Sequence, residues 1–95
     1  MTPLTPELAE RAAGLSLNDL GPEVRHWASR AIADTIACAI AGAPEEVVRK
    51  LAAVLPMAPG PATLLGQPGR AHVLDAAQIN GVAAHALDFD DCNLE

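Results

Sequence analysis

Aromatic residues are nearly absent from this chain of 95 residues, which contains one Trp, one Phe and no Tyr. Half of the residues are apolar (51%), but alanine is frequent among them. Because aromatic side chains bury the largest areas in protein cores, the core that this sequence can build is thin. A chain of this length buries only about 60–65% of its unfolded surface. We therefore expect further sequence or a partner chain to complete the fold.

Cysteine and basic residues are also scarce. Cys38 and Cys92 have no metal-ligand spacing and form no disulfide framework, so reduced thiols are the simplest interpretation. The few Lys and Arg residues are scattered and the formal net charge is −6, which argues against nucleic-acid binding. No apolar run approaches the roughly 20 residues of a transmembrane helix, and the start lacks the features of a signal peptide. These absences predict a cytoplasmic protein that binds neither nucleic acid nor membrane.

Strand patterns are almost absent, whereas helix signals recur. Thr5, Pro6 and Glu7 are typical of a helix start, with Thr5 as N-cap, and this helix is expected to end near Gly14. A second helix is predicted from about Pro22 to Gly42. Its apolar residues follow the three-and-four spacing of a buried face, and they are Val24, Trp27, Ala28, Ala31, Ile32, Thr35 and Ala39.

Two more helices are predicted in the second half of the chain. The third covers about residues 44–55. The prolines and glycines of Pro56–Gly69 then block any long helix and leave room only for a short extended segment at Ala62–Leu65. The fourth helix runs from His72 or Val73 to Leu87 and is apolar nearly all round, which is typical of a helix surrounded by protein. We therefore predict an all-α fold of about four helices with one irregular connection, forming one partial domain over residues 1–95.

The end of the fourth helix concentrates one imidazole and several carboxylates within the sequence NGVAAHALDFDD, residues 80–91. Gly81, His85 and Asp88 are separated by four and then three residues, so on a helix they project from one side, with Asn80 beside them. A carboxylate and an imidazole placed in this way suit acid–base catalysis.

Three other interpretations of this cluster remain open from spacing alone. Asp90 or Asp91 would serve as the N-cap of a following helix, and His85 as a hydrogen-bonded core histidine. A metal site would use the same side chains, but the segment lacks the ligand order of a calcium loop and any paired His spacing. A Cys92 nucleophile with His85 as its base is a weaker signal still, because a lone Cys–His pair so close in sequence is common.

The segment NGVAAHALDFDD resembles the signature of the MmgE/PrpD family, which includes 2-methylcitrate dehydratase, cis-aconitate decarboxylase and iminodisuccinate epimerase. The similarity extends upstream through LTPELAERAAGLSLNDLGPEVRHWASRAIADTIACAIAG, residues 4–42, and includes the connecting stretch ATLLGQPGR, residues 62–70. Family members are several times longer. The resemblance therefore implies the N-terminal portion of the family's helical domain.

The resemblance also implies a chemistry, which is acid–base catalysis on a small polycarboxylate, most closely of the 2-methylcitrate dehydratase type, with no metal or cofactor. It makes Asp88 the catalytic carboxylate that contacts or deprotonates the substrate, and it places His85 and Cys92 in contact with substrate. Cys92 stands where the family usually has threonine, so a weaker thiol donor replaces a hydroxyl. The remaining motif positions have structural roles by this resemblance, and they are Asn80, Gly81, Asp90 and Asp91.

A polycarboxylate substrate needs cationic partners, and no Lys or Arg follows Arg70 in this sequence. In the family such groups come from the portion beyond the resemblance. We therefore expect the isolated chain to be catalytically silent and to form a homo-oligomer or bind a partner chain. The alternative function is that of a non-catalytic helical subunit or remnant that binds a second chain.

Overall fold

The computed structural model describes residues 3–89, which are mostly helical. The elements in chain order are α1 (Leu4–Gly14), a 3-10 turn η1 (Leu17–Asp19), α2 (Pro22–Gly42), α3 (Glu46–Val54), β1 (Ala62–Thr63), β2 (Arg70–Ala71) and α4 (Val73–His85). This composition confirms the predicted helical fold with one irregular connection. The chain divides into two compact units, Met1–Arg30 and Ala31–Glu95, which are described separately below.

The predicted helices are all present, but their ends differ from the prediction. The first helix begins at Leu4, with Pro3 at the N-cap position and no side-chain cap, so the assignment of Thr5 as N-cap is wrong. The fourth helix ends at His85, before the predicted Leu87. The extended segment predicted from Ala62 is present as β1, and its antiparallel pairing with β2 was not predicted.

The first unit is held together by local hydrogen bonds, because no residue of α1 or η1 is buried. The Asp19 carboxylate accepts hydrogen bonds from the backbone N–H and the hydroxyl of Ser16, both at 2.8 Å. These hydrogen bonds, the one from the hydroxyl first, lower the pKa of Asp19 from its ordinary value. The guanidinium of Arg25 donates to the carbonyl oxygens of Leu20, at 3.0 Å, and Leu17. Arg25 thus ties the 3-10 turn to the first turns of α2.

The predicted buried face of α2 is mostly exposed in the described residues. Only Ala39 and Gly42 of this helix are buried, whereas Trp27 is 58% exposed and Ile32 is 62% exposed. The apolar spacing specifies a face that can be buried, but the rest of the described chain does not cover it. The prediction of a buried face is therefore wrong for most of its residues.

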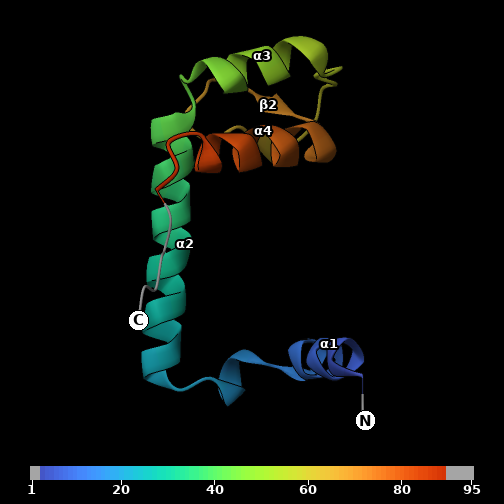
Figure 1. Ribbon diagram of the computed structural model, residues 1–95, viewed down its shortest axis with the longest axis vertical. Coiled ribbons are helices and arrows are strands. Elements are labelled where there is room, and N and C mark those ends of the chain that lie inside the picture. Colours follow the sequence, from blue (N-terminus) through green and yellow to red (C-terminus); the bar gives the residue numbers. More distant parts are fainter. Residues whose placement is uncertain (1–2, 90–95) are drawn as a thin grey trace. The chain divides into compact units, whose positions relative to one another are not determined.

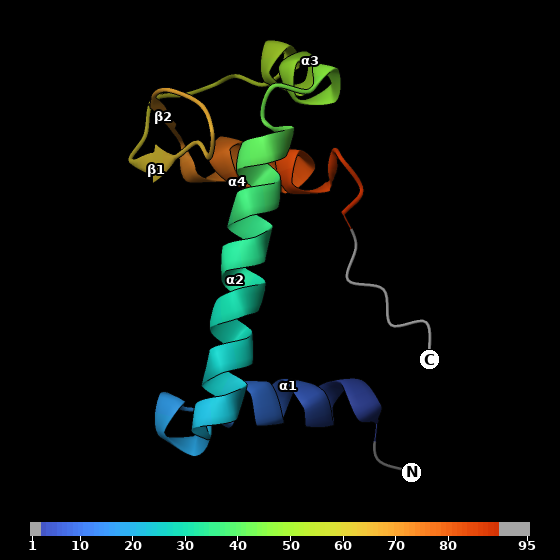
Figure 2. The same cartoon turned by 90° about the vertical axis from the view of Figure 1, so that its left-hand side faces the viewer.

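The core of the second unit lies between α3, α4 and the β1–β2 hairpin. Figure 1 shows α3 and α4 side by side, and Figure 2 shows the hairpin beside α4. Ile79 and Val48 are the largest fully buried side chains, one from each helix. The other buried members of this cluster are mostly alanines, as the scarcity of large side chains predicts, and they are Ala39, Leu64, Ala71, Ala76 and Ala83.

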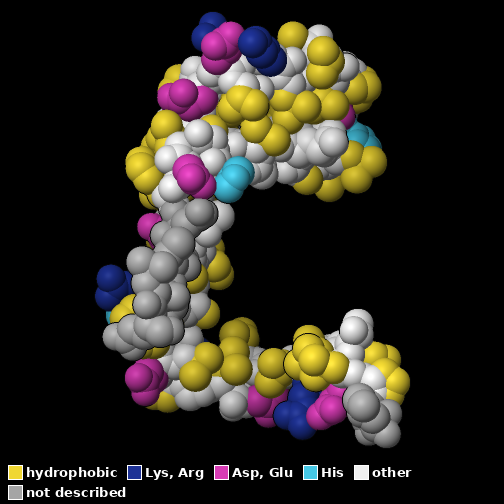
Figure 3. Space-filling view, in the orientation of Figure 1, with side chains coloured by type: hydrophobic (Ala, Val, Ile, Leu, Met, Phe, Trp, Pro, Cys, Tyr) yellow, Lys and Arg dark blue, Asp and Glu magenta, His cyan; other side chains and the backbone are white. Residues whose placement is uncertain are grey.

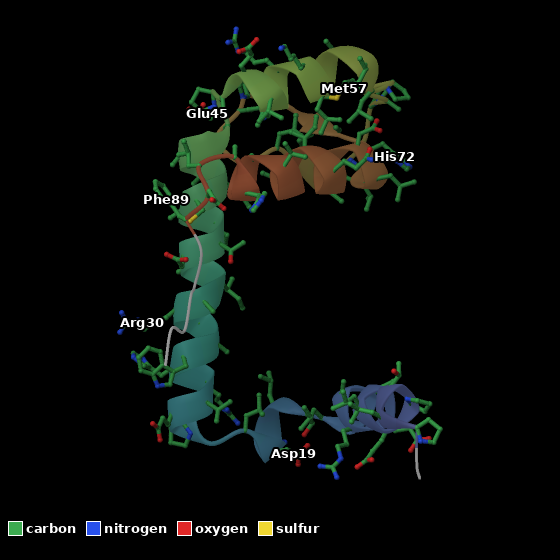
Figure 4. All side chains as sticks on the ribbon, in the orientation of Figure 1. Asp19, Arg30, Glu45, Met57, His72 and Phe89 are labelled. Atoms are coloured by element: carbon green, nitrogen blue, oxygen red, sulfur yellow. The ribbon has the colours of Figure 1, made fainter. Side chains whose placement is uncertain are left out.

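Two polar side chains of α4 hold the irregular connection onto the helix. The buried Asp75 carboxylate accepts a hydrogen bond from the backbone N–H of Ala58 at 3.0 Å. The amide of Asn80 accepts from the N–H of Leu65 and donates to the carbonyl oxygen of Thr63, both at 2.9 Å. Figure 4 shows Met57 and His72 at the same end of this unit, where the His72 N–H donates to the carbonyl oxygen of Ala58 at 2.7 Å. The connection is therefore held by side chains of α4 in addition to its own β1–β2 pairing.

The described residues cover only part of α4, so the prediction of a helix surrounded by protein is not met by this part of the chain alone and stays a prediction for the completed fold. One face is buried, while Val73 is 57% exposed and Leu74 is 70% exposed. Figure 3 shows hydrophobic side chains at the surface of α3 and α4. No helix within residues 3–89 is long and apolar enough to cross a membrane.

Candidate functional site

The candidate site forms where α4 ends. His85 is the last residue of the helix, and the next turn tightens, because the N–H of Ala86 donates to the carbonyl oxygen of Ala83 at 3.3 Å. The N–H of Asp88 then donates to the carbonyl oxygen of His85 at 2.9 Å, and Asp88 adopts a left-handed conformation with φ of 54°. Aspartate is one of the few non-glycine residues that enter this region readily. Asp88 therefore lies on a turn after the helix, and its predicted position on the helix is wrong.

Gly81 and His85 of α4 and Asp88 of the turn line one open groove of about 550 Å³. Among the described residues, the groove is also lined by Val82 and Ala86 of α4 and by Val47 of α3. The side chains of His85 and Asp88 are exposed to solvent. The three residues that share the four-and-three spacing are thus neighbours in space, although the turn and not the helix places the last of them.

The other motif residues are not part of the described groove. Asn80 turns its amide toward the irregular connection, where both of its polar ends are hydrogen-bonded. Asp90, Asp91 and Cys92 lie outside the described residues. The interpretations that depend on them, an N-cap by either aspartate and a role for the Cys92 thiol, therefore remain predictions.

Val47 is a groove residue that the sequence did not indicate. It is 50% exposed, while the adjacent Val48 is 1% exposed and packs in the core. Val48 therefore faces the core, whereas Val47 lies on the edge of α3, at the boundary between its buried and exposed sides. Only the packing of α3 on α4 turns that edge toward His85, so no spacing within the sequence could identify Val47.

The groove contains two side chains that can transfer protons, and it also has an apolar wall. His85 contributes an imidazole and Asp88 a carboxylate, and both kinds of group serve as general acids or bases in enzymes. Val47, Val82 and Ala86 supply the apolar wall, and Gly81 adds no side chain to it. Among the groove residues that the structure describes, only His85 can carry a positive charge. Within residues 3–89 no group of three or more His, Cys, Asp or Glu side chains is placed to hold a metal ion.

A second, smaller groove of about 290 Å³ lies on α2 and is lined by Ala31, Ile32, Thr35 and Ile36 in the described part of the chain. None of these side chains titrates or carries charge. The groove at the end of α4 is therefore the candidate site for chemistry.

A family model described as the MmgE/PrpD N-terminal domain matches residues 6–95. The match covers nearly the whole chain, including both helices that line the groove, so the chain belongs to the MmgE/PrpD family. No curated protein and no solved structure gives a significant match.

Proposed function

We propose that this MmgE/PrpD N-terminal domain supplies one wall of an active site that acts on a small polycarboxylate by acid–base chemistry, most closely that of a 2-methylcitrate dehydratase-type lyase. The observation that carries the proposal is the groove at the end of α4, where His85 and Asp88 lie together. Membership in the MmgE/PrpD family supports this choice of reaction class, and the groove contains residues of the types that the chemistry requires.

In this proposal Asp88 acts on the substrate directly. Dehydration beside a carboxylate removes a proton from carbon, forms the carbon–carbon double bond and expels the hydroxyl group, which leaves as water after it gains a proton. Asp88 takes the proton from carbon or gives one to the hydroxyl. His85, one turn back along α4, hydrogen-bonds a carboxylate of the substrate.

The described groove would hold only part of such a substrate. Several carboxylates need several cationic or hydrogen-bonding partners, and in the described groove His85 is the single group that can be cationic. We propose that a second chain or further sequence supplies the other cations. The isolated 95-residue chain is then expected to show no turnover of 2-methylcitrate above a buffer control, measured by the absorbance of the unsaturated product.

The decisive test uses a site completed with the remaining part of a family enzyme. Asp88→Asn is expected to lower kcat by about 100-fold or more, because the amide cannot transfer the proton. Glu10→Gln on the exposed face of α1 is the matched control and should leave kcat unchanged. Equal effects of the two substitutions on kcat would show that Asp88 does not take part in the reaction. Circular dichroism of each variant checks that the fold is retained.

The alternative function, a non-catalytic helical subunit that binds a second chain, is favoured by the exposed apolar side chains of α2. Val24 is 52% exposed and Ile32 is 62% exposed, and such surfaces commonly mark interaction sites. Sedimentation of the chain with a candidate partner separates the two functions. A stable complex whose activity is the same with wild-type, Asp88→Asn and His85→Ala chains would support the non-catalytic function.

A further inference from the structure

We infer that Gly42, the last residue of α2, is a positioning residue that sets the spacing between the two walls of the groove at the end of α4. Gly42 is buried and does not itself line the described groove. Its backbone instead meets the segments that carry both walls. The expected effect on catalysis rests on the proposed function, whereas the expected effect on the shape of the groove does not.

The first contact of Gly42 is with the last turn of α4 (Figure 2). A Cβ atom placed on Gly42 would overlap the carbonyl oxygen of Ala83 and would lie 3.3 Å from the Cβ of Ala86. The same carbonyl accepts the N–H of Ala86, and the next hydrogen bond of this turn joins the N–H of Asp88 to the carbonyl of His85. Only a residue without a side chain therefore lets α2 approach the segment that carries His85 and Asp88 so closely.

The second contact of Gly42 is with the start of α3. The carbonyl oxygen of Gly42 accepts the backbone N–H of Glu45 at 3.0 Å, and Glu45 is the N-cap residue of α3. Val47, which lines the groove, follows in the first turn of that helix. The backbone of Gly42 is therefore hydrogen-bonded to the wall that contains Val47 and packed against the wall that contains His85 and Asp88.

The turn after α4 is the segment that a side chain at position 42 would displace. Ala43 at the end of α2 is buried and also packs against the irregular connection, since a Cβ atom on Gly66 would lie 2.9 Å from the Cβ of Ala43. The hydrogen bond that closes the last turn of α4, at 3.3 Å, is longer than the usual range of about 2.7–3.2 Å. Asp88, beyond it, is exposed. The weakly held turn therefore yields before the packed end of α2.

Nuclear magnetic resonance of the isotope-labelled 95-residue chain tests the positioning. Gly42→Ala is expected to shift the Cα and Cβ resonances of Asp88 away from the values of a left-handed residue. The amide of Asp88 should exchange about fivefold faster, as expected when a turn loses a hydrogen bond that contributes about 1 kcal/mol. The methyl resonances of Val47 should shift as well, because the spacing of the walls changes. Unchanged Asp88 resonances in Gly42→Ala would overturn the inference.

Ile79→Val is the matched control for loss of packing alone. Ile79 is fully buried in the core of the same unit and does not line the described groove, and removing one methylene from it lowers stability without adding a contact. The control should leave the Asp88 resonances unchanged. Equal shifts in both variants would show that Gly42 acts only through stability. Sodium sulfate, which favours compact states, keeps both variants folded for the comparison.

The kinetic measurement uses a site completed with the remaining part of a family enzyme. Gly42→Ala is expected to lower kcat/KM by about tenfold per folded molecule, because a small displacement of catalytic groups is costly. Ile79→Val should leave kcat/KM unchanged.

The two measurements separate this inference from the proposed function. Shifted Asp88 resonances together with an unchanged kcat/KM in Gly42→Ala would uphold the positioning and contradict the proposed role of Asp88. Unshifted resonances, with kcat lowered by Asp88→Asn, would overturn the positioning and leave the proposed function standing.

Discussion

The backbone N–H of Asp88 donates to the carbonyl oxygen of His85 at 2.9 Å, and this turn places the candidate acid–base residue just after His85, the last residue of α4. The same turn requires a positive φ of 54° at Asp88. Site geometry and backbone conformation are therefore coupled at one residue, since a substitution there changes both unless it tolerates the left-handed region.

Substitutions at position 88 are expected to separate these two effects. Asp88→Gly and Asp88→Asn keep the turn, because both residues enter the left-handed region readily, whereas Asp88→Ala strains it by about 1 kcal/mol. Amide hydrogen exchange at residue 88, corrected for intrinsic rates, should be about fivefold faster in the alanine variant than in the glycine variant. Equal protection in all three variants would mean that the turn does not hold the residue in this conformation.

Alanine substitutions at Gly42 and Gly81 are expected to change the free energy of unfolding in opposite directions. A Cβ on Gly42 would overlap the carbonyl oxygen of Ala83, where α2 meets α4, whereas Gly81 has open space. Gly42→Ala should lower the free energy of unfolding by about 1–3 kcal/mol through overpacking. Gly81→Ala should raise it by about 0.5–1 kcal/mol, because alanine favours the helix. Urea denaturation measures both, and a shift in the same direction would show that the contact of Gly42 is misjudged.

Asn80 is expected to be a stability residue, because its amide holds Thr63 and Leu65 of the irregular connection on α4. Asn80→Ala should lower the free energy of unfolding by about 1–3 kcal/mol, since it leaves two backbone groups without a partner. The exposed Gln78 on the same helix is the control, and Gln78→Ala should change stability by less than about 0.5 kcal/mol. Hydrogen exchange gives the local measurement. The Leu65 amide should lose protection only in the Asn80 variant.

The capping box of Ser16 and Asp19 predicts a local pH dependence. Because hydrogen bonds from Ser16 lower the pKa of Asp19 in the folded turn, the ionised carboxylate stabilises the turn above the unfolded pKa, about 4. That stabilisation is lost as the pH falls through the lower, folded pKa. An NMR titration of the Asp19 carboxyl carbon should therefore show a midpoint below the ordinary value. Ser16→Ala should return the midpoint toward that value, and an unchanged midpoint would contradict the assigned cause.

Local sequence signals predicted the helices of this protein well. The prolines at positions 22, 44 and 56 and the glycine at 42 mark helix ends through backbone restrictions that act on their immediate neighbours. Those restrictions hold in any tertiary context. The family motif likewise identified His85 and Asp88 as residues to examine, because a motif is a property of the sequence alone.

The sequence by itself therefore determined where helices form, which side chains are apolar and which family the chain belongs to. Only the tertiary structure decided that Ala62 pairs with Ala71 and that Val47 faces the groove. It also decided that Ile32 is exposed while Val48 is buried. The physical reason is the distance along the chain over which each effect acts. Backbone preferences act within one or two turns of chain, whereas burial, strand pairing and groove formation depend on residues distant in sequence, whose packing no local pattern encodes.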